Sequence, residues 1–196
     1  MEVKVNVNED MSLWADLKNG DEKALKRMYD DHAESLYCYA KKFTKDQGLI
    51  EDAIHDLFVN IWRRKESIGL TDSIIKYLCV SLRRDIIRRL KSEQRVATPY
   101  DDRMDIGFDW SVEDTLAKKE EESIQAKKLE NAMAKLSARQ REAVYLKFFE
   151  ELSYEDICEV MELNYQSARN LIARALTELR QILKLWAFIL IFLFIG

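Results

Sequence analysis

The stretch SYEDICEVMELNYQSARNLIARAL, residues 153–176, decides the fold of the C-terminal part of this chain. It begins with Ser153, a typical helix N-cap residue in front of helically spaced apolar residues. The turn Glu162-Leu163-Asn164 separates this short helix from a longer one, in which the small residues Ala168 and Ala175 face inward. Two helices joined by a short turn, with small residues at their crossing, predict a helix-turn-helix.

Composition extends the helical prediction to the rest of the chain. Its 196 residues include 5 Gly and 1 Pro, too few turn-forming residues for a β-sandwich, a barrel or a βαβ enzyme. Apolar residues recur every three or four positions in most segments, as in amphipathic helices. Asp21 is predicted to cap one of these helices, and Ser137 and Gln140 are predicted to form a capping box at the start of another. The 3 Cys are far apart and form no Cys-x-x-Cys pair, which argues against a disulfide framework and for a reducing cytoplasm. We expect an all-α protein.

Charge and periodicity divide the chain into two small helical domains and their flanking segments. The stretch 98–122 holds nine acidic and three basic residues, a local charge of −6, and its periodicity is weak. It is therefore predicted to be a linker. The predicted segments are an N-terminal tail with a short helix after Ser12 (1–20), a first domain (21–96), the acidic linker (97–122), a second domain with the helix-turn-helix (123–184) and an apolar tail (185–196).

A helix predicted over residues 72–95 carries a basic face opposite its apolar one. Six basic and two acidic residues lie between Arg83 and Arg95, a local charge of +4 in a chain whose net charge is −4. Clustered cations on one helix face suit phosphate contacts, and a neighbouring aromatic ring suits single-stranded nucleic acid. The alternative is a solvated helix face, which the absence of acidic residues from this stripe disfavours. The candidates are Tyr77, Arg83, Arg84, Arg88, Lys91 and Arg95.

The second helix of the helix-turn-helix offers side chains that can contact DNA bases. Arginine can pair with guanine, and asparagine or glutamine with adenine, while all of them can also contact phosphates. The alternative is the ordinary polar face of a bundle helix. The candidates are Gln166, Ser167, Arg169, Asn170 and Arg174.

A third polar face lies on the helix predicted around residues 50–61. Its members are Glu51, Asp52, His55, Asp56 and Asn60. A metal site is rejected, because carboxylates are routine on exposed helix faces and no second ligand cluster is evident; a protein-contact face is favoured. No Gly-rich phosphate loop, nucleophile elbow or paired-His motif occurs. We therefore expect no enzyme, no catalytic residue, no cofactor, no metal and no small-molecule substrate.

Three stretches, in this order and spacing, resemble bacterial sigma factors of the extracytoplasmic-function (ECF) group. They are residues 50–62, residues 77–91 and residues 136–176, and the likeness extends over about residues 12–183. The family usually has Gln where His55 stands, Asn where Arg84 stands and Asp where Arg88 stands. The second helix of the helix-turn-helix also departs from the usual Thr-Val-Lys-Ser-Arg pattern. Its start, residues 164–167, resembles the Bacteroidetes branch.

The resemblance implies a sigma factor that binds core RNA polymerase, recognises promoter DNA and promotes transcription initiation. By this likeness, the face from Glu51 to Asn60 would contact core polymerase, and the basic helix would hold melted minus-ten DNA. The residues from Gln166 to Arg174 would read the minus-thirty-five element. The loop 65–72 would receive a flipped base, and the linker would run toward the polymerase active-site cleft. A membrane-associated anti-sigma factor would be the regulator of this cytoplasmic protein, which it could hold at the inner membrane.

Two other classes of function remain open from the sequence. One is a stand-alone helix-turn-helix regulator whose N-terminal domain senses a signal or dimerises. The other is a membrane-tethered interaction protein, suggested by the apolar tail 185–196. Eleven helical residues reach only about 16 Å, against about 30 Å of bilayer hydrocarbon. We therefore expect this tail to be a docking element, with a dispensable chain end as the alternative.

Overall fold

The computed structural model describes residues 7–97, 107–109 and 120–195, and within them the side chains of residues 8–92, 107–109 and 127–182. The described residues form eight α-helices and no strand, so the all-α prediction is confirmed. The chain separates into two compact units, residues 1–104 and residues 105–196.

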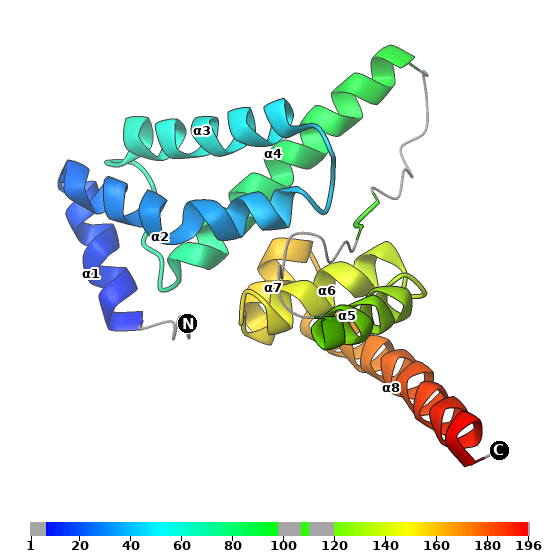
Figure 1. Cartoon of the computed structure of the whole chain (residues 1–196). Coiled ribbons are helices and arrows are strands. Elements are labelled where there is room, and N and C mark those ends of the chain that lie inside the picture. Colours follow the sequence, from blue (N-terminus) through cyan, green and yellow to red (C-terminus); the bar gives the residue numbers. More distant parts are fainter. Residues whose placement is uncertain (1–6, 98–106, 110–119, 196) are drawn as a thin grey trace. The chain divides into compact units, whose positions relative to one another are not determined.

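The described part of the N-terminal unit is built from four helices. They are α1 (Val7–Lys18), α2 (Glu22–Ala40), α3 (Gln47–Arg64) and α4 (Ile74–Ala97). Helix α1 packs on α2, while α2 and α3 lie side by side and α4 crosses both of them (Figure 1). Trp14, Met28, Ile50, Leu78 and Ile86 are among the fully buried residues at their centre. The carboxylate of Asp21 accepts the backbone N–H of Lys23, which confirms its predicted capping role.

Helix α1 begins six residues earlier than the sequence predicts, at Val7 and not at Leu13 after Ser12. The acidic residues in the first turn of α1 stabilise the helix, because the N-terminal end of the helix dipole is positive. Two of them also make contacts that no local pattern reveals: Glu9 pairs with Arg27 of α2, and Asp10 accepts the backbone N–H of Ile74 at 2.8 Å. Tertiary contacts therefore extend this helix toward the N-terminus.

Four helices also make up the C-terminal unit where the structure describes it. They are α5 (Glu120–Met133), α6 (Ala138–Phe148), α7 (Tyr154–Met161) and α8 (Tyr165–Ile195). The predicted capping box of Ser137 and Gln140 is present at the start of α6, and Ser153 caps α7. Residues 162–164 join α7 to α8, with Glu162 in the left-handed conformation at φ 54°. The side chain of Asn164 caps α8 by accepting the backbone N–H of Ser167 at 2.8 Å.

These contacts confirm the helix-turn-helix. Helices α7 and α8 pack on each other, and both Ala168 and Ala175 are fully buried. Helix α8 continues to Ile195, so the predicted tail 185–196 is, up to that residue, a continuation of the same helix. The side chains of this tail lie outside the described residues, and its docking role stays a prediction. Among the described residues, no helix has the length and hydropathy needed to span a bilayer.

One residue of the predicted linker packs inside the C-terminal unit. Phe108 is 1% exposed, and its ring lies edge-on to Tyr145 with the centroids 5.9 Å apart. The backbone carbonyl of Phe108 accepts a hydrogen bond from Nε of Arg141 at 2.6 Å. The same guanidinium donates to carbonyls at and just after the end of α5, including that of Leu136 at 2.8 Å. Apart from Ala97, residues 107–109 and the first turn of α5, the predicted linker lies outside the described residues.

Candidate functional site

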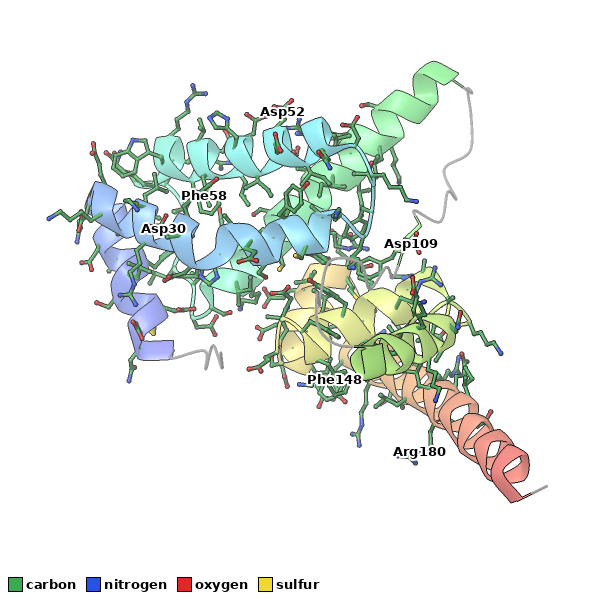
Figure 2. All side chains as sticks on the ribbon, in the orientation of Figure 1. Asp30, Asp52, Phe58, Asp109, Phe148 and Arg180 are labelled. Atoms are coloured by element: carbon green, nitrogen blue, oxygen red, sulfur yellow. The ribbon has the colours of Figure 1, made fainter. Side chains whose placement is uncertain are left out.

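The predicted polymerase-binding residues form one exposed face of α3. Glu51, Asp52, His55, Asp56 and Asn60 are all exposed, while the opposite side of the helix buries its apolar residues in the core. Figure 2 shows Asp52 on the side of α3 that faces away from α2. The arrangement offers a protein partner acidic and polar groups along about three helical turns.

Asp56 differs from its neighbours because it is already bonded to α4. Nη2 of Arg89 donates to Oδ2 of Asp56 at 2.7 Å, and Nε of the same guanidinium donates to Asp85 at 2.6 Å. The hydrogen bond from Arg89 holds the pKa of the Asp56 carboxyl below its ordinary value. Asp56 thus links the predicted polymerase face to the basic helix within the N-terminal unit.

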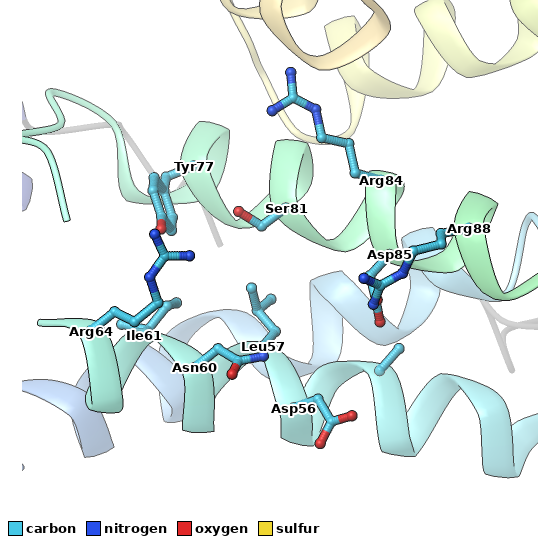
Figure 3. A pocket seen from close by; sticks show the side chains of 11 residues that line it. Asp56, Leu57, Asn60, Ile61, Arg64, Tyr77, Ser81, Arg84, Asp85 and Arg88 are labelled. Atoms are coloured by element: carbon cyan, nitrogen blue, oxygen red, sulfur yellow. The ribbon is translucent and has the colours of Figure 1, made fainter. Parts of the chain in front are cut away.

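A groove of about 370 Å³ runs between α3 and α4. Its lining residues are Ala53, Asp56, Leu57, Asn60, Ile61 and Arg64 of α3 and Tyr77, Ser81, Arg84, Asp85 and Arg88 of α4. Figure 3 shows Arg64 extending toward Tyr77, and Arg84 pointing away from α3. The groove therefore places two predicted polymerase residues beside three predicted DNA residues.

The basic stripe of α4 is partly neutralised by its own helix. Arg84 and Arg88 are exposed, and Arg83 and Lys91 are half-buried. The guanidinium of Arg88 pairs with Asp85, so the expectation that acidic residues are absent from this stripe is wrong. The Arg88 side chain remains 77% exposed, and an exposed ion pair of this kind contributes little free energy. A phosphate can therefore replace the carboxylate as the partner of Arg88.

Two other members of the predicted minus-ten set occupy different environments. Tyr77 is half-buried, and its ring lies edge-on to Trp14 with the centroids 4.8 Å apart. Tyr77 also lines the groove. Arg95 belongs to α4, but its side chain lies outside the described residues.

The candidate base-reading residues lie on the exposed face of α8. Gln166, Arg169, Asn170 and Arg174 are exposed, whereas Ser167 is half-buried. Nε2 of Gln166 donates to Oδ1 of Asn170 at 2.9 Å, one helical turn away. This pairing leaves amide donors and acceptors of both side chains for other partners. The face therefore combines neutral amides with two guanidinium groups.

Several residues at these sites were not singled out by sequence reasoning. Arg64 and Ser81 line the groove, and Asp85 and Arg89 organise the ion pairs around it. The i, i+4 spacing of Asp85 and Arg89 is a signal that could have identified their pairing. The contact between Asp56 and Arg89 joins residues 33 positions apart, which no helical spacing reveals. No group of three His, Cys, Asp or Glu suited to a metal ion occurs among the described residues.

Comparison with known families matches both units. Residues 28–96 match Sigma-70 region 2, and residues 126–179 match Sigma-70, region 4. The ECF RNA polymerase sigma factor SigK of Mycolicibacterium vanbaalenii is 22% identical over 171 residues, which cover 83% of each chain. The RNA polymerase sigma factor SigV of Bacillus subtilis is 23% identical over 150 residues, covering 76% of this chain and 85% of SigV.

Two solved structures have a similar fold. CnrH, in complex with the cytosolic domain of CnrY, gives a TM-score of 0.60 at 18% identity, covering 89% of this chain and 97% of CnrH. The sigma factor RpoE of Bartonella quintana, in complex with the anti-sigma factor NepR, gives a TM-score of 0.61 at 21% identity, covering 83% of this chain and 98% of RpoE. At these identities the likeness supports the fold.

Proposed function

The chain belongs to the sigma-70 family as an ECF-type sigma factor with regions 2 and 4 that directs RNA polymerase to promoters, and we propose that its two units divide promoter recognition between them. Region 2, in the N-terminal unit, binds core polymerase through α3 and melted minus-ten DNA through α4. Region 4, in the C-terminal unit, reads the minus-thirty-five element with α8. The chain is not an enzyme, because the family acts by directing the polymerase.

The groove between α3 and α4 is the observation that carries this proposal. It brings an exposed acidic and polar face next to a basic one within a single unit. A protein partner suits the first kind of surface and a nucleic-acid strand suits the second, and the hydrogen bond between Arg89 and Asp56 connects the two helices. The residues proposed for core binding and those proposed for minus-ten binding are therefore adjacent in space, although they are separate in sequence.

We assign the contacts with core polymerase to the exposed face of α3. Asp52 is the principal candidate, because it is an exposed carboxylate of that face. Asp56 contributes less to the partner, since it is held by Arg89. The full proposed set is Glu51, Asp52, His55, Asp56 and Asn60.

We assign the contacts with melted minus-ten DNA to the basic face of α4. Arg84 and Arg88 are exposed along the groove and can neutralise phosphates. Tyr77 offers the edge of its ring to an unpaired base. Arg83, Lys91 and Arg95 complete the proposed set.

Minus-thirty-five recognition is assigned to the exposed face of α8. Arg169 and Asn170 are the proposed base-reading residues, and Arg174 lies about one turn further along and suits a phosphate contact. Gln166 pairs with Asn170 and can orient its amide. Ser167, at the helix start, completes the set.

An anti-sigma factor is the proposed regulator. CnrH and RpoE, the two structural relatives described above, were solved as complexes with the cytosolic domain of CnrY and with the anti-sigma factor NepR. We propose a membrane-associated partner of this kind, which would hold the chain in the cytoplasm at the inner membrane. The Asn164-Tyr165-Gln166-Ser167 start of α8 supports a Bacteroidetes-type lineage.

Run-off transcription with purified core polymerase tests the proposed function. The template carries the DNA upstream of the gene for this chain, and a discrete transcript is expected only when both chain and core are present. Asp52→Arg should weaken core capture, while Glu34→Arg, the same charge change at an exposed position of α2, serves as the matched control. Specific promoter binding without core, and no transcript with it, would instead identify a stand-alone helix-turn-helix regulator.

A further inference from the structure

The loop between α3 and α4 is held in place by the N-terminal helix α1. Nε1 of Trp14 donates to the backbone carbonyl of Gly69 at 2.8 Å. Nζ of Lys18 donates to the carbonyl of Ile68 at 2.6 Å. Helix α1 therefore restrains two consecutive carbonyls of a loop that lies 50 or more residues further along the chain.

The far end of the loop is restrained as well. Asp10 of α1 accepts the backbone N–H of Ile74, the first residue of α4, at 2.8 Å. Within the loop, Oγ1 of Thr71 donates to the carbonyl of Ser73 at 2.9 Å. The backbone on both sides of Leu70 is thus fixed by hydrogen bonds, although Leu70 itself is 84% exposed.

The contacts of α1 also reach the proposed minus-ten site. Trp14 is 1% exposed, and besides its hydrogen bond to Gly69 it packs edge-on against Tyr77, with the ring centroids 4.8 Å apart. One buried side chain therefore sets both the path of the loop and the position of the aromatic residue that lines the groove. The Sigma-70 region 2 match begins at residue 28, so α1 lies outside it.

We propose that α1 is a positioning element for promoter melting: Trp14 and Lys18 fix the loop between α3 and α4 so that Leu70 is presented to the bases of the minus-ten DNA. This inference rests on the proposed function of region 2. Ordering a free loop costs roughly 1–2 kcal/mol per residue, so a loop ordered in advance binds without meeting that cost. Apolar side chains such as leucine are the kind that enter between base steps and unstack them.

The three side chains of α1 have distinct roles in this arrangement. Lys18 restrains the backbone next to Leu70, Trp14 joins the loop to Tyr77, and Asp10 fixes the start of α4. None of them needs to touch DNA. A single exposed leucine is common on protein surfaces, so the inference depends on the hydrogen bonds that orient Leu70 and not on its exposure alone.

Lys18→Met in the full chain, assembled with core polymerase, tests the inference. The substitution keeps the aliphatic stem and removes the ammonium donor, so the amides around Leu70 should exchange faster while the exchange of α3 stays unchanged. Open-complex formation on duplex promoter DNA should fall by about tenfold, which is the effect of losing one hydrogen bond from a charged donor. The permanganate reactivity of unpaired thymines measures this opening. Core binding should remain at the wild-type level.

The controls separate positioning from a general structural defect. Lys18→Arg keeps a donor and should restore opening, and Lys23→Met, the same change at an exposed position of α2, should have no effect. Leu70→Ser should impair opening on duplex DNA but not on a template that is already unpaired at the minus-ten element. Normal opening by Lys18→Met or by Leu70→Ser, or parallel loss of core binding and opening in Lys18→Met, would overturn the inference. If the wild-type chain forms no open complex with core at all, it is the proposed function that fails.

Discussion

The candidate DNA-binding side chains of the two units have different local partners. On α4, Arg88 and Arg89 pair with Asp85, and Arg89 also reaches Asp56. On the exposed face of α8, the hydrogen bond between Gln166 and Asn170 joins two neutral amides. The first arrangement suits an exchange of carboxylate for phosphate, which depends on charge, and the second suits hydrogen bonds to base edges. The expected difference is that region 2 binds DNA with a strong salt dependence and region 4 with sequence preference.

The units are alike in depending on residues outside their matched family regions. Region 2 uses α1, and region 4 uses Phe108, which precedes its match by 18 positions. The dependence differs in kind. Trp14 and Lys18 restrain a surface loop, whereas Phe108 fills part of the core and its carbonyl binds Arg141. Phe108 should therefore matter mainly for stability, and Lys18 mainly for the shape of one loop.

The largest expected effect is the loss of Phe108. Phe108→Ala should lower the free energy of unfolding of the C-terminal unit by about 3–5 kcal/mol, the usual cost of removing a buried phenylalanine side chain. Native-state amide exchange in α6 should rise by roughly a hundredfold or more, while exchange in α3 of the other unit should not change. Leu70→Ala provides the contrast, because an 84% exposed leucine contributes little to stability. Unchanged protection of α6 would show that Phe108 is not part of that core.

The next effect concerns the salt dependence of DNA binding by region 2. Replacing Arg84, Arg88 and Lys91 together by Ala should flatten the log–log dependence of minus-ten single-strand binding on salt by about two units, at roughly 0.7 per phosphate contact. Arg180→Ala, an exposed arginine of α8 outside the proposed sites, is the matched control and should leave the slope unchanged. Binding titrations of the holoenzyme over a range of salt concentrations measure this slope. A slope equal to that of the wild type would mean that the stripe of α4 is an ordinary solvated face.

Sequence preference is expected to depend on α8 and not on α4. Arg169→Ala or Asn170→Ala should each remove about 1–3 kcal/mol of discrimination at one base pair of the minus-thirty-five element. Selection from a randomised promoter library would show relaxed preference at that position. Arg174→Ala should instead weaken all sequences alike. If Arg169→Ala and Asn170→Ala also weaken binding uniformly, both residues contact the DNA backbone and the contrast between the units disappears.

Local signals in the sequence predicted much of this architecture. The N-cap of Asp21, the capping box of Ser137 and Gln140 and the turn before α8 depend on residues a few positions apart, and all are present. The helix-turn-helix follows from the same local rules. The polar faces of α3 and α8 were predicted by helical periodicity, since exposed and buried positions alternate with the helix repeat.

Long-range contacts explain what sequence reasoning missed. Phe108 lies in a stretch whose acidic composition indicates a linker, yet its ring is buried against Tyr145, 37 positions later. The hydrogen bonds from Trp14 and Lys18 to the loop likewise join segments that no periodic pattern relates. The i, i+3 spacing of Asp85 and Arg88 could have predicted their pairing, but the net charge of the segment does not show which acidic residue pairs with which basic one.

The smallest expected effect is a difference in acid sensitivity between the units. The chain has 2 His, and both lie in the N-terminal unit. Burial lowers the pKa of His32 below its ordinary value of 6.5, and the carboxylates of Asp10 and Asp31 oppose this shift only in part. The unfolded chain therefore binds a proton at His32 more readily than the folded one. The contribution of neutral His32 to stability is present above pH 6.5 and is lost as pH falls below that value toward the pKa of the folded state.

Amide exchange in α2 and in α6, corrected for the intrinsic effect of pH, measures this difference. Between pH 7 and pH 5.5, the protection of α2 should decrease slightly, while that of α6 should stay constant because region 4 contains no histidine. The C-terminal unit does contain Cys158, but burial raises the pKa of that thiol, which moves its titration further from this range. His32→Gln should remove the pH dependence of α2, and His55→Gln, at an exposed position of α3, should preserve it. Equal acid sensitivity in both units, or a His32→Gln chain with the wild-type pH dependence, would assign the effect to carboxylates and not to His32.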